Sequence, residues 1–416
     1  MKKAVLSIIV VAILIIVSIF SVNWIYKTGD FSSGPEPTTV HELVNCSNEF
    51  SFEMYKQLAK DKSQENIFFS PYSITTALGM AYEGARGDTA REMAHVLNFP
   101  ADNETRWSMM KSYQEYFNSI SDSYNLSTAN AYWLKENQNL LETYKIAIES
   151  YYLAHGEELD FAGDPTGSAE TINTWVEEQT NGKIPNLIDP NLITRETYLV
   201  LTNAIYFKSD WEYRFNPYAT HLRKFYLDDG EEIETGLMNL NDWSIEFNYT
   251  SNSDDQLLQL PYKNREISMY IILPNENDIS SLESRLDYSY LNSLMDNMTS
   301  QNVNIFMPRF KFEQTYELKK MLSDMGMPEA FSNGADFSGI TDTVSLKISN
   351  VIHQSFVAVN ENGTEAAAAT AVIMNPTGAP APHLPIFCAD HPFIFLIRHE
   401  STGQILFMGR VGNPGA

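Results

Sequence analysis

Positive charge is scarce in this chain of 416 residues. It carries 28 lysine and arginine residues against 53 aspartate and glutamate residues, which gives a formal net charge of −25. So acidic a surface repels phosphate and sulfate groups, and no cluster of lysine or arginine counters this anywhere in the sequence. The composition therefore argues against a nucleic acid or a heparin-like polyanion as a partner.

Cysteine is almost absent as well. The two cysteines, Cys46 and Cys388, are too few for a disulfide scaffold, and without a CxxC pair a zinc knuckle is excluded. They can form one bridge at most. Two free thiols are the expected state, and pairing of Cys46 with Cys388 stays open.

The sequence also lacks the short motifs that mark common enzyme classes. It contains no GxSxG nucleophile elbow, HExxH zinc motif, phosphate-binding loop or GxGxxG loop. No two of the eight histidines stand at the spacing of a helical metal site; they are His41, His95, His155, His221, His353, His383, His391 and His399. We expect no catalytic residue, no metal and no cofactor, and an enzyme is the least favoured interpretation.

A long apolar run occupies the N-terminus. Lys2 and Lys3 precede residues 4–25, which are long enough to cross a bilayer because roughly 20 residues suffice. Trp24 and Tyr26 stand where a cleaved signal peptide would need small side chains. For residues 1–27 we therefore favour an uncleaved anchor over a signal peptide. Either one predicts that the rest is extracellular, secreted or tethered to the outer face of the cell membrane.

The exported part reads as a short linker followed by one domain. Residues 28–40 are polar and contain glycines and prolines, which is typical of a linker. No second linker and no repeat follows, so we expect a single domain over residues 41–416. In its first part, Phe52, Tyr55 and Leu58 recur at helical spacing, and residues 73–82 follow Ser70-Pro71 in the manner of a capped helix.

The middle and the end of the domain are rich in strand patterns. Residues 199–207 form an apolar run that suits the buried centre of a sheet. Residues 257–261 and 267–273 indicate one hairpin, and residues 392–398 and 404–411 indicate a second. Helices packed on large, mostly antiparallel sheets make an α+β fold the expected class.

One segment differs in composition from the rest of the chain: residues 361–385, ENGTEAAAATAVIMNPTGAPAPHLP. It can be interpreted as an alanine-rich surface helix, but an isolated helix of about ten residues is marginal in water. No proline occurs before Pro376, so about eleven residues are able to enter a sheet as a strand. One face of that strand would be uncharged and would carry Thr364, Ala366, Ala368, Thr370, Val372 and Met374.

At this segment and in four further blocks, the sequence resembles the serpin family of protease inhibitors. The five blocks follow the family's order, and the resemblance extends from about His41 to Pro414; they are residues 66–93, 201–217, 307–340, 361–371 and 389–414. The resemblance implies three β-sheets, eight or nine helices and an exposed reactive-centre loop at about residues 361–385.

The resemblance also assigns roles to individual residues. Those that match the family's shutter, beneath the central sheet, are Ser70, Ser73, Asn203 and His353. Those that match the hinge of the loop are Glu361, Gly363, Thr364, Glu365, Ala366, Ala367, Ala368 and Ala369. Trp211 matches the breach, where the loop enters the sheet, and Arg309 matches the ion-pair partner of Glu361.

The mechanism implied by this family is a trap. A protease attacks the loop and forms an acyl-enzyme, and the freed segment then inserts into the large sheet before deacylation is complete. Counting from Gly363 by the family's spacing places the scissile bond between Thr377 and Gly378. Met374 and Ala379 are alternatives, because the loop is about four residues longer than in common members.

The composition of the loop limits the classes of protease that we expect as partners. No lysine or arginine occurs from Glu361 to Ile397, so trypsin-like proteases, whose pocket binds a cation, are poor targets. We expect a monomer that inhibits an elastase-like or subtilisin-like serine protease, with a cysteine protease as a weaker candidate. The alternative is a non-inhibitory serpin-fold binding or storage protein. The absence of charged, bulky or proline residues from the inserting face of the hinge favours the inhibitor.

Overall fold

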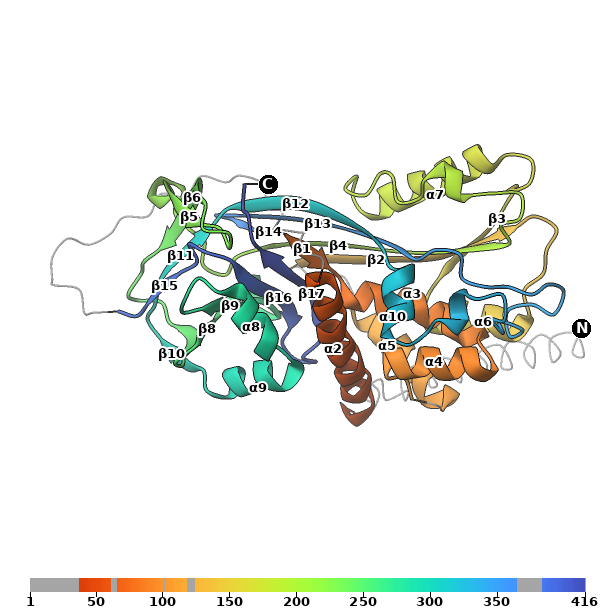
Figure 1. Cartoon of the computed structure of the whole chain (residues 1–416), viewed down its shortest axis with the longest axis horizontal. Helices are drawn as coiled ribbons and strands as arrows, with labels where there is room; N and C mark the ends of the chain where they lie inside the picture. Colours follow the sequence, from red (N-terminus) through yellow and green to blue (C-terminus); the bar gives the residue numbers. More distant parts are fainter. Residues whose placement is uncertain (1–36, 61–65, 101, 118–123, 365–383, 416) are drawn as a thin grey trace, which may run out of the picture.

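The computed structural model describes residues 37–60, 66–100, 102–117, 124–364 and 384–415. Within these ranges it has nine α-helices and three β-sheets (Figure 1). The expected anchor or signal segment, residues 1–27, lies outside them. Among the helices of the described part, none combines the length and the apolar character that crossing a membrane requires.

The helices are mainly in the first half of the domain. They are α2 (Pro37–Ala59), α3 (Pro71–Gly84), α4 (Gly87–Leu97), α5 (Asn103–Phe117), α6 (Glu142–Tyr151), α7 (Pro165–Gln179), α8 (Ile279–Arg285), α9 (Tyr288–Asp296) and α10 (Lys319–Met325). Short 3₁₀ turns are η1 (Pro190–Leu192), η2 (Pro217–Ala219), η3 (Lys263–Arg265) and η4 (Glu329–Phe331). Helix α2 begins inside the segment 28–40 that the sequence indicated as a linker, because a proline is well suited to the first turn of a helix.

The sheet that contains the hinge residues is six-stranded, with the order β12-β13-β14-β4-β2-β3. Its strands are β2 (Tyr124–Lys135), β3 (His155–Leu159), β4 (Leu199–Asp210), β12 (Phe310–Glu317), β13 (Ile352–Asn360) and β14 (Gly363–Thr364). The predicted strand at residues 199–207 is β4, in the interior of this sheet. Figure 1 shows α7 on one side of the sheet and α3, α4, α5 and α6 on the other.

Two further sheets complete the fold. The seven-stranded sheet contains β1 (Ile67–Phe69), β17 (Ile405–Val411), β16 (Phe393–His399), β9 (Ile267–Pro274), β8 (Asp255–Pro261), β7 (Phe247–Ser251) and β10 (Thr299–Gln301), in that order. The four-stranded sheet contains β15 (Ile386–Cys388), β11 (Asn304–Pro308), β6 (Glu232–Leu240) and β5 (His221–Tyr226). Both predicted hairpins are confirmed, as β8–β9 and β16–β17, and so is the α+β class.

The core divides into two parts, one on each face of the six-stranded sheet. The larger cluster joins this sheet to the seven-stranded sheet and includes Phe207 and Val357. The smaller one lies between the sheet and α7 and includes Trp133 and Ile172. Strands β2 and β4 contribute residues to both clusters, whereas outward residues of β12 such as Lys311 and Glu313 are exposed. A strand added beside β4 would therefore need small or apolar side chains on its inner face.

Both cysteines are free thiols, as the sequence predicted. Burial, helped by nearby carboxylates, raises the pKa of Cys46 to about 11 and that of Cys388 to about 12. Both therefore remain protonated and unreactive at neutral pH.

Candidate functional site

The hinge of the loop already forms part of the six-stranded sheet. Strand β14, described at Gly363 and Thr364, lies between β13 and β4 and is antiparallel to both. Thr364 pairs with Val359 on one side and with Ser209 on the other. The segment 361–385 therefore joins the sheet as a strand at Gly363 and Thr364, which rules out a helix that starts at these two residues.

Next to the pairs that include β14, the strands β13 and β4 each pair with one further strand. Strand β13 pairs along its full length with β12, and β4 pairs with β2. Among the described residues, no ladder joins β4 directly to β13. We call this stretch, residues 199–208 of β4 opposite residues 352–358 of β13, the slot.

Gly363 is held in a position that no other residue fits. Its φ is +155°, and a Cβ atom there would overlap the carbonyl oxygen of Ser209 and lie 2.7 Å from the Cα of Asp210. This glycine therefore permits close contact between the hinge and β4.

Aromatic side chains line the point at which the hinge enters. The hydroxyl group of buried Thr364 lies 2.5 Å from that of Tyr262, and the Tyr262 ring stacks on Trp211 with centroids 4.4 Å apart. Burial raises the pKa of Tyr262 above its ordinary value. The indole Nε1 of Trp211 donates to Asn360 O at 2.9 Å, and its backbone N–H donates to Asn362 O at 2.8 Å. Trp211 thus lies where the resemblance placed the breach, whereas Tyr262 was missed.

Glu361 and Arg309 form the expected ion pair. Arg309 Nε donates to Glu361 Oε1 at 2.6 Å, and the Thr220 hydroxyl donates to the same oxygen at 2.5 Å. Burial alone would raise the pKa of Glu361, but the hydrogen bonds from Arg309 and Thr220 outweigh it and lower this pKa. The pair fixes Glu361, which lies two residues before the hinge strand β14. Thr220 is a contributor that no sequence pattern indicated.

The expected shutter residues meet below the slot in a polar network. Ser70 caps α3 by accepting a hydrogen bond from Ser73 N at 3.1 Å, and its hydroxyl donates to Leu406 O at 2.7 Å. The Ser73 hydroxyl donates to Asn203 Oδ1, and Asn203 Nδ2 donates to Asn130 Oδ1. The network ties α3, β2, β4 and β17 together at the middle of the sheet.

Asn130 extends this network, and it was missed from the sequence. Its Nδ2 donates to Gln114 Oε1 at 2.9 Å and to Tyr152 O at 2.8 Å. Both Asn130 and Gln114 are buried, so each would be costly to leave without partners. Nothing in their sequence neighbourhoods distinguishes them from ordinary polar residues.

His353 of β13 faces the same network from the other side of the slot. Its Nε2 accepts a hydrogen bond from Ser70 N at 3.0 Å, and its side chain is buried. Burial lowers the pKa of His353 to about 3, so the ring is neutral at pH 7. Because Nε2 is the acceptor, the ring proton is on Nδ1. Two residues along the strand, the Ser355 hydroxyl donates to Phe68 O at 2.6 Å and fixes β13 on β1.

The remaining candidate residues lie outside the described ranges. This holds for hinge residues Glu365, Ala366, Ala367, Ala368 and Ala369. It also holds for the candidate bond residues Met374, Thr377, Gly378 and Ala379. Their assignments stay predictions.

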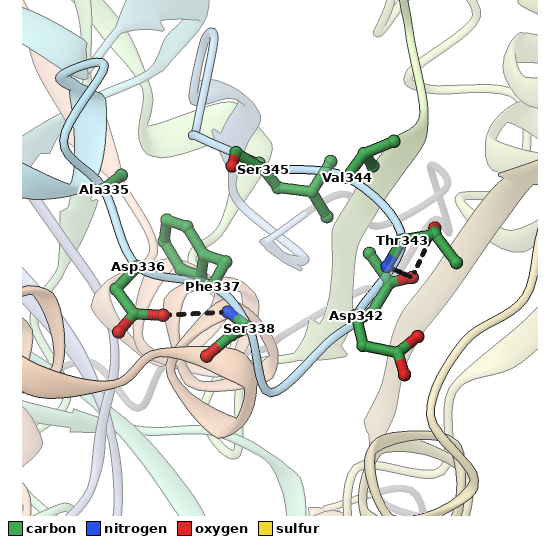
Figure 2. A pocket seen from close by; sticks show the side chains of 10 residues that line it. Ala335, Asp336, Phe337, Ser338, Asp342, Thr343, Val344 and Ser345 are labelled. Carbon is green, nitrogen blue, oxygen red and sulfur yellow. Dashed lines mark hydrogen bonds between the residues drawn. The ribbon is translucent and has the colours of Figure 1, made fainter.

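Two cavities lie away from the hinge and the network. One, of about 240 Å³, is formed by residues 335–346; Figure 2 shows Asp336 bonded to the backbone of Ser338 at its edge. The other, of about 670 Å³, lies between α7 and the start of β13, with Ile352 in its wall. No group of side chains suited to hold a metal ion occurs in the described part of the chain.

The described part of the chain thus holds a six-stranded sheet in which the short strand β14 lies between β13 and β4. A family model described as serpin (serine protease inhibitor) matches residues 45–414. The chain belongs to the serpin family.

Relatives and solved structures agree with this assignment. An uncharacterized serpin-like protein of Thermococcus kodakarensis is 43% identical over 374 residues, which cover 89% of this chain and 86% of the relative. Serpin48 of the insect Tenebrio molitor, a highly specific serpin, matches with a TM-score of 0.79 at 37% identity, over 89% of this chain and 98% of its own. Human thyroxine-binding globulin complexed with its hormone matches with a TM-score of 0.80 at 28% identity, over 91% and 100%.

The family supports protease inhibition in general. It also includes non-inhibitory members such as thyroxine-binding globulin. The choice between inhibitory and non-inhibitory serpins depends on whether the cleaved loop can insert between β4 and β13.

Proposed function

We propose that this protein is an irreversible, suicide-substrate inhibitor of serine proteases. A protease would cleave the reactive-centre loop, stay attached as an acyl-enzyme and be displaced while the loop inserts between β4 and β13. The observation that carries this proposal is β14, because Gly363 and Thr364 of the loop already pair with β13 on one side and with β4 on the other. Insertion would extend β14, and the added residues would continue its existing register with β13 and β4.

The slot supplies the driving force for this extension. An antiparallel strand between β4 and β13 would add backbone hydrogen bonds on both of its edges, each worth about 0.5–1.5 kcal/mol net. From Ser209, where Thr364 pairs, β4 continues to Leu199, which the same register would place opposite Met374. No proline precedes that point in the loop, so the ladder has no missing donor.

The length of the inserted segment accounts for inhibition. An extended chain from Gly363 to Thr377, at about 3.3 Å per residue, spans roughly 50 Å. A protease joined to Thr377 would be moved by most of that distance. The pull on the acyl-enzyme would distort its catalytic geometry, because small misplacements of reacting groups slow reactions strongly.

The proposed target is an elastase-like or subtilisin-like protease. The loop offers uncharged residues on both sides of the candidate bonds and no cation from Glu361 to Ile397. The apolar N-terminal run at residues 4–25 supports a protein that acts outside the cell, secreted or tethered to the membrane surface. We propose that it acts there as a monomer.

The test is incubation with an elastase-like, a subtilisin-like and a trypsin-like protease. We expect an SDS-resistant one-to-one complex with at least one of the first two and none with the trypsin-like control. Mass spectrometry of the released C-terminal peptide then identifies the cleaved bond. Quantitative cleavage of the loop without any complex would show that the protein is a substrate and would contradict inhibition.

A non-inhibitory binding protein is the second candidate, favoured by the similarity to thyroxine-binding globulin and by the lengthened loop. The two candidates differ in the stability of the cleaved chain. An inhibitor gains stability when the cut loop inserts, whereas a binding protein that does not insert keeps the stability of its intact form. Guanidinium unfolding before and after loop cleavage separates them.

A further inference from the structure

We propose that the cavity between α7 and the start of β13 binds an aliphatic polyamine, which is a flexible chain of methylene groups that carries two or more ammonium groups. The cavity has a volume of about 670 Å³, and pockets for small organic ligands usually have volumes of roughly 300–1,000 Å³. Binding at this place would not depend on whether the protein inhibits a protease.

Three parts of the chain form the walls of this cavity. Helix α7, which lies over the six-stranded sheet (Figure 1), forms one wall, residues 185–192 form the second, and the ends of β12 and β13 form the third. Asn173 of α7 joins the first two walls, because its Nδ2 donates to Ile188 O at 2.8 Å and its Oδ1 accepts from Ile188 N at 2.8 Å. In the third wall, Glu317 of β12 pairs with Ile352 of β13. Contacts within the protein therefore shape the cavity before any ligand binds.

The buried part of the lining includes several apolar side chains. Leu187 and Ile188 are 5% and 8% exposed and belong to the smaller core cluster, and Ile352 packs against the same cluster. Leu192 adds a further apolar side chain to the lining. Methylene groups that cover these side chains remove apolar surface from water, which favours binding. The lining therefore suits a ligand with an aliphatic middle.

The charged part of the lining is acidic. Its four carboxylates are those of Glu170, Glu177, Asp189 and Glu317, and no lysine or arginine lines the cavity. All four residues are exposed, and within the described part of the chain none of them forms an ion pair. Charges of one sign around a concave site with apolar walls focus their field, so the cavity attracts cations more strongly than a flat acidic surface does. The charge of the lining therefore favours a cationic ligand.

The carboxylates do not converge as the ligands of a metal ion do. In the described part of the chain, no three side chains of histidine, cysteine, aspartate or glutamate form a group that could hold a metal ion. Glu170 and Glu177 are two helical turns apart, about 10 Å along α7, and Glu317 lies on the wall formed by β12. A metal ion has a single centre of charge, whereas a polyamine has several ammonium groups with methylene groups between them. Separated carboxylates around an apolar surface therefore match a polyamine.

A lysine side chain of another protein would offer the same alkylammonium chemistry. It carries one ammonium group, however, and its other end is fixed to a protein backbone. A free polyamine can instead reach carboxylates on α7 and on β12 at the same time. The positions of Glu177 and Glu317 on different walls therefore favour the free ligand.

A bound polyamine would connect α7 to the sheet. In the unfolded chain the four carboxylates no longer surround one cavity, so the ligand should bind the folded protein preferentially and stabilise it. Urea is the suitable denaturant for measuring this stabilisation, because it is uncharged and does not compete for the carboxylates. The midpoint of urea unfolding should therefore rise with the concentration of the polyamine.

The test is isothermal titration calorimetry of the full chain with spermidine, with octanediol and magnesium chloride as control ligands. Octanediol has an aliphatic chain without charge, and Mg²⁺ has charge without a chain. We expect spermidine to bind saturably in a one-to-one ratio, and less tightly at higher ionic strength because salt screens the carboxylates. Neither control ligand should bind with comparable affinity.

Two pairs of variants determine whether spermidine lies in this cavity. Thr174→Arg places a guanidinium group among the carboxylates, whereas Thr171→Arg adds the same charge at an exposed threonine of α7 outside the lining. Glu177→Gln removes one carboxylate of the lining, whereas Glu178→Gln removes an exposed carboxylate that is not part of it. We expect Thr174→Arg to weaken spermidine binding about tenfold and Glu177→Gln about fivefold. Thr171→Arg and Glu178→Gln should bind nearly as wild type does.

Urea unfolding gives an independent readout of the same site. Spermidine should raise the midpoint of wild type and of Thr171→Arg, and should leave that of Thr174→Arg unchanged. Without spermidine, Thr174→Arg should unfold at a higher urea concentration than Thr171→Arg, because its guanidinium group takes the place of the ligand.

Failure of spermidine to bind saturably would overturn the polyamine site. Equal binding by Thr174→Arg and Thr171→Arg would overturn it too, since spermidine would then bind elsewhere on the acidic surface. Equal affinity for octanediol would show that the carboxylates take no part, and tighter binding of Mg²⁺ would show a metal site in place of a polyamine site. A blocked peptide of two lysines that binds more tightly than spermidine would identify a basic protein segment as the ligand and would also overturn it.

Discussion

The hydroxyl groups of Tyr262 and Thr364 lie 2.5 Å apart, although 102 residues separate them in sequence. Both side chains are buried, Tyr262 fully, and the Tyr262 ring is held by its stack on Trp211. This contact holds the first residues of the loop inside the sheet. We therefore expect single substitutions at this contact to change how firmly the hinge is held in the sheet of the intact protein.

Tyr262→Phe removes this hydrogen bond and leaves the Thr364 hydroxyl buried. We expect the intact protein to lose about 1–2 kcal/mol of unfolding free energy, because a buried hydroxyl group loses its partner. Urea unfolding of the intact form measures the loss. Tyr218→Phe is the control, since Tyr218 is 74% exposed and its hydroxyl group is solvated. Equal stability of the two variants would mean that the Tyr262 contact does not hold the hinge.

Gly363→Ala should expel the hinge from the sheet. The added methyl group would overlap the backbone of β4, and φ of +155° is unfavourable for alanine, so we expect a loss of about 1–3 kcal/mol. Faster proteolysis at the hinge would accompany this loss. Gly236→Ala is the control, because the nearest atom to its added Cβ is Thr220 Cγ2 at an ordinary 3.5 Å. A Gly363→Ala protein with wild-type stability and proteolysis would contradict the close approach.

The sequence indicated local features of this site well and long-range ones poorly. Ser70-Pro71 was recognisable as a helix start because a capping residue and a proline act within one turn. The strand at residues 199–207 was recognisable because burial on both faces leaves a continuous apolar run. Glu361 and Arg309 came from the family resemblance, since no pattern in a single sequence pairs residues so far apart.

Other parts of the site carry no sequence signal. Tyr262 follows a strand and looks like an ordinary aromatic residue beside a turn, and Asn130 occupies one of many polar positions. The pairing of Gly363 and Thr364 with Asp210 and Ser209 of β4 joins residues far apart in sequence, which local composition does not encode. The fold was therefore predictable, whereas the contacts of the hinge were not.

Glu361 should make the intact protein sensitive to acid. Because its pKa is lowered in the folded state, the ionised carboxylate stabilises the fold above the unfolded pKa of 4.5, and this contribution is lost as pH falls through the folded pKa. Glu361→Gln should cost about 1 kcal/mol at pH 7, a modest amount because Arg309 is half exposed. Unfolding free energies at pH 7 and pH 3 measure the difference from wild type. If the difference in unfolding free energy between wild type and Glu361→Gln were larger at pH 3 than at pH 7, the ion pair would be contradicted.

His353 should add a second acid-sensitive step at higher pH. Its pKa falls from 6.5 to about 3 on folding, so the unfolded chain binds the extra proton between these values. The stabilisation is complete above pH 6.5 and declines as pH falls toward 3, by at most about 1.4 kcal/mol per pH unit. His353→Gln should flatten the fall in stability between pH 6.5 and 4.5, whereas His95→Gln, at an exposed site, should leave it unchanged. An equal slope in wild type and His353→Gln would show that His353 does not titrate as its burial requires.

The register of β14 also gives a prediction for charge. The residue after Thr364 is Glu365, which an extended strand would place opposite Lys208 on the outer face of the sheet. Opposite charges directly across two strands contribute roughly 0.2–1 kcal/mol, and like charges there are destabilising. Lys208→Glu should therefore lower the guanidinium midpoint of the cleaved protein and leave that of the intact form nearly unchanged.

The reciprocal variant Lys208→Glu/Glu365→Lys restores the pair with its charges exchanged, and it should recover the midpoint of the cleaved protein. Lys111→Glu on α5 is the control for net charge, because it makes the same change far from the slot in sequence and on another element. If the exchanged pair recovers nothing, then Glu365 does not lie opposite Lys208. The inserted strand would then follow a register other than the one that begins at Gly363 and Thr364.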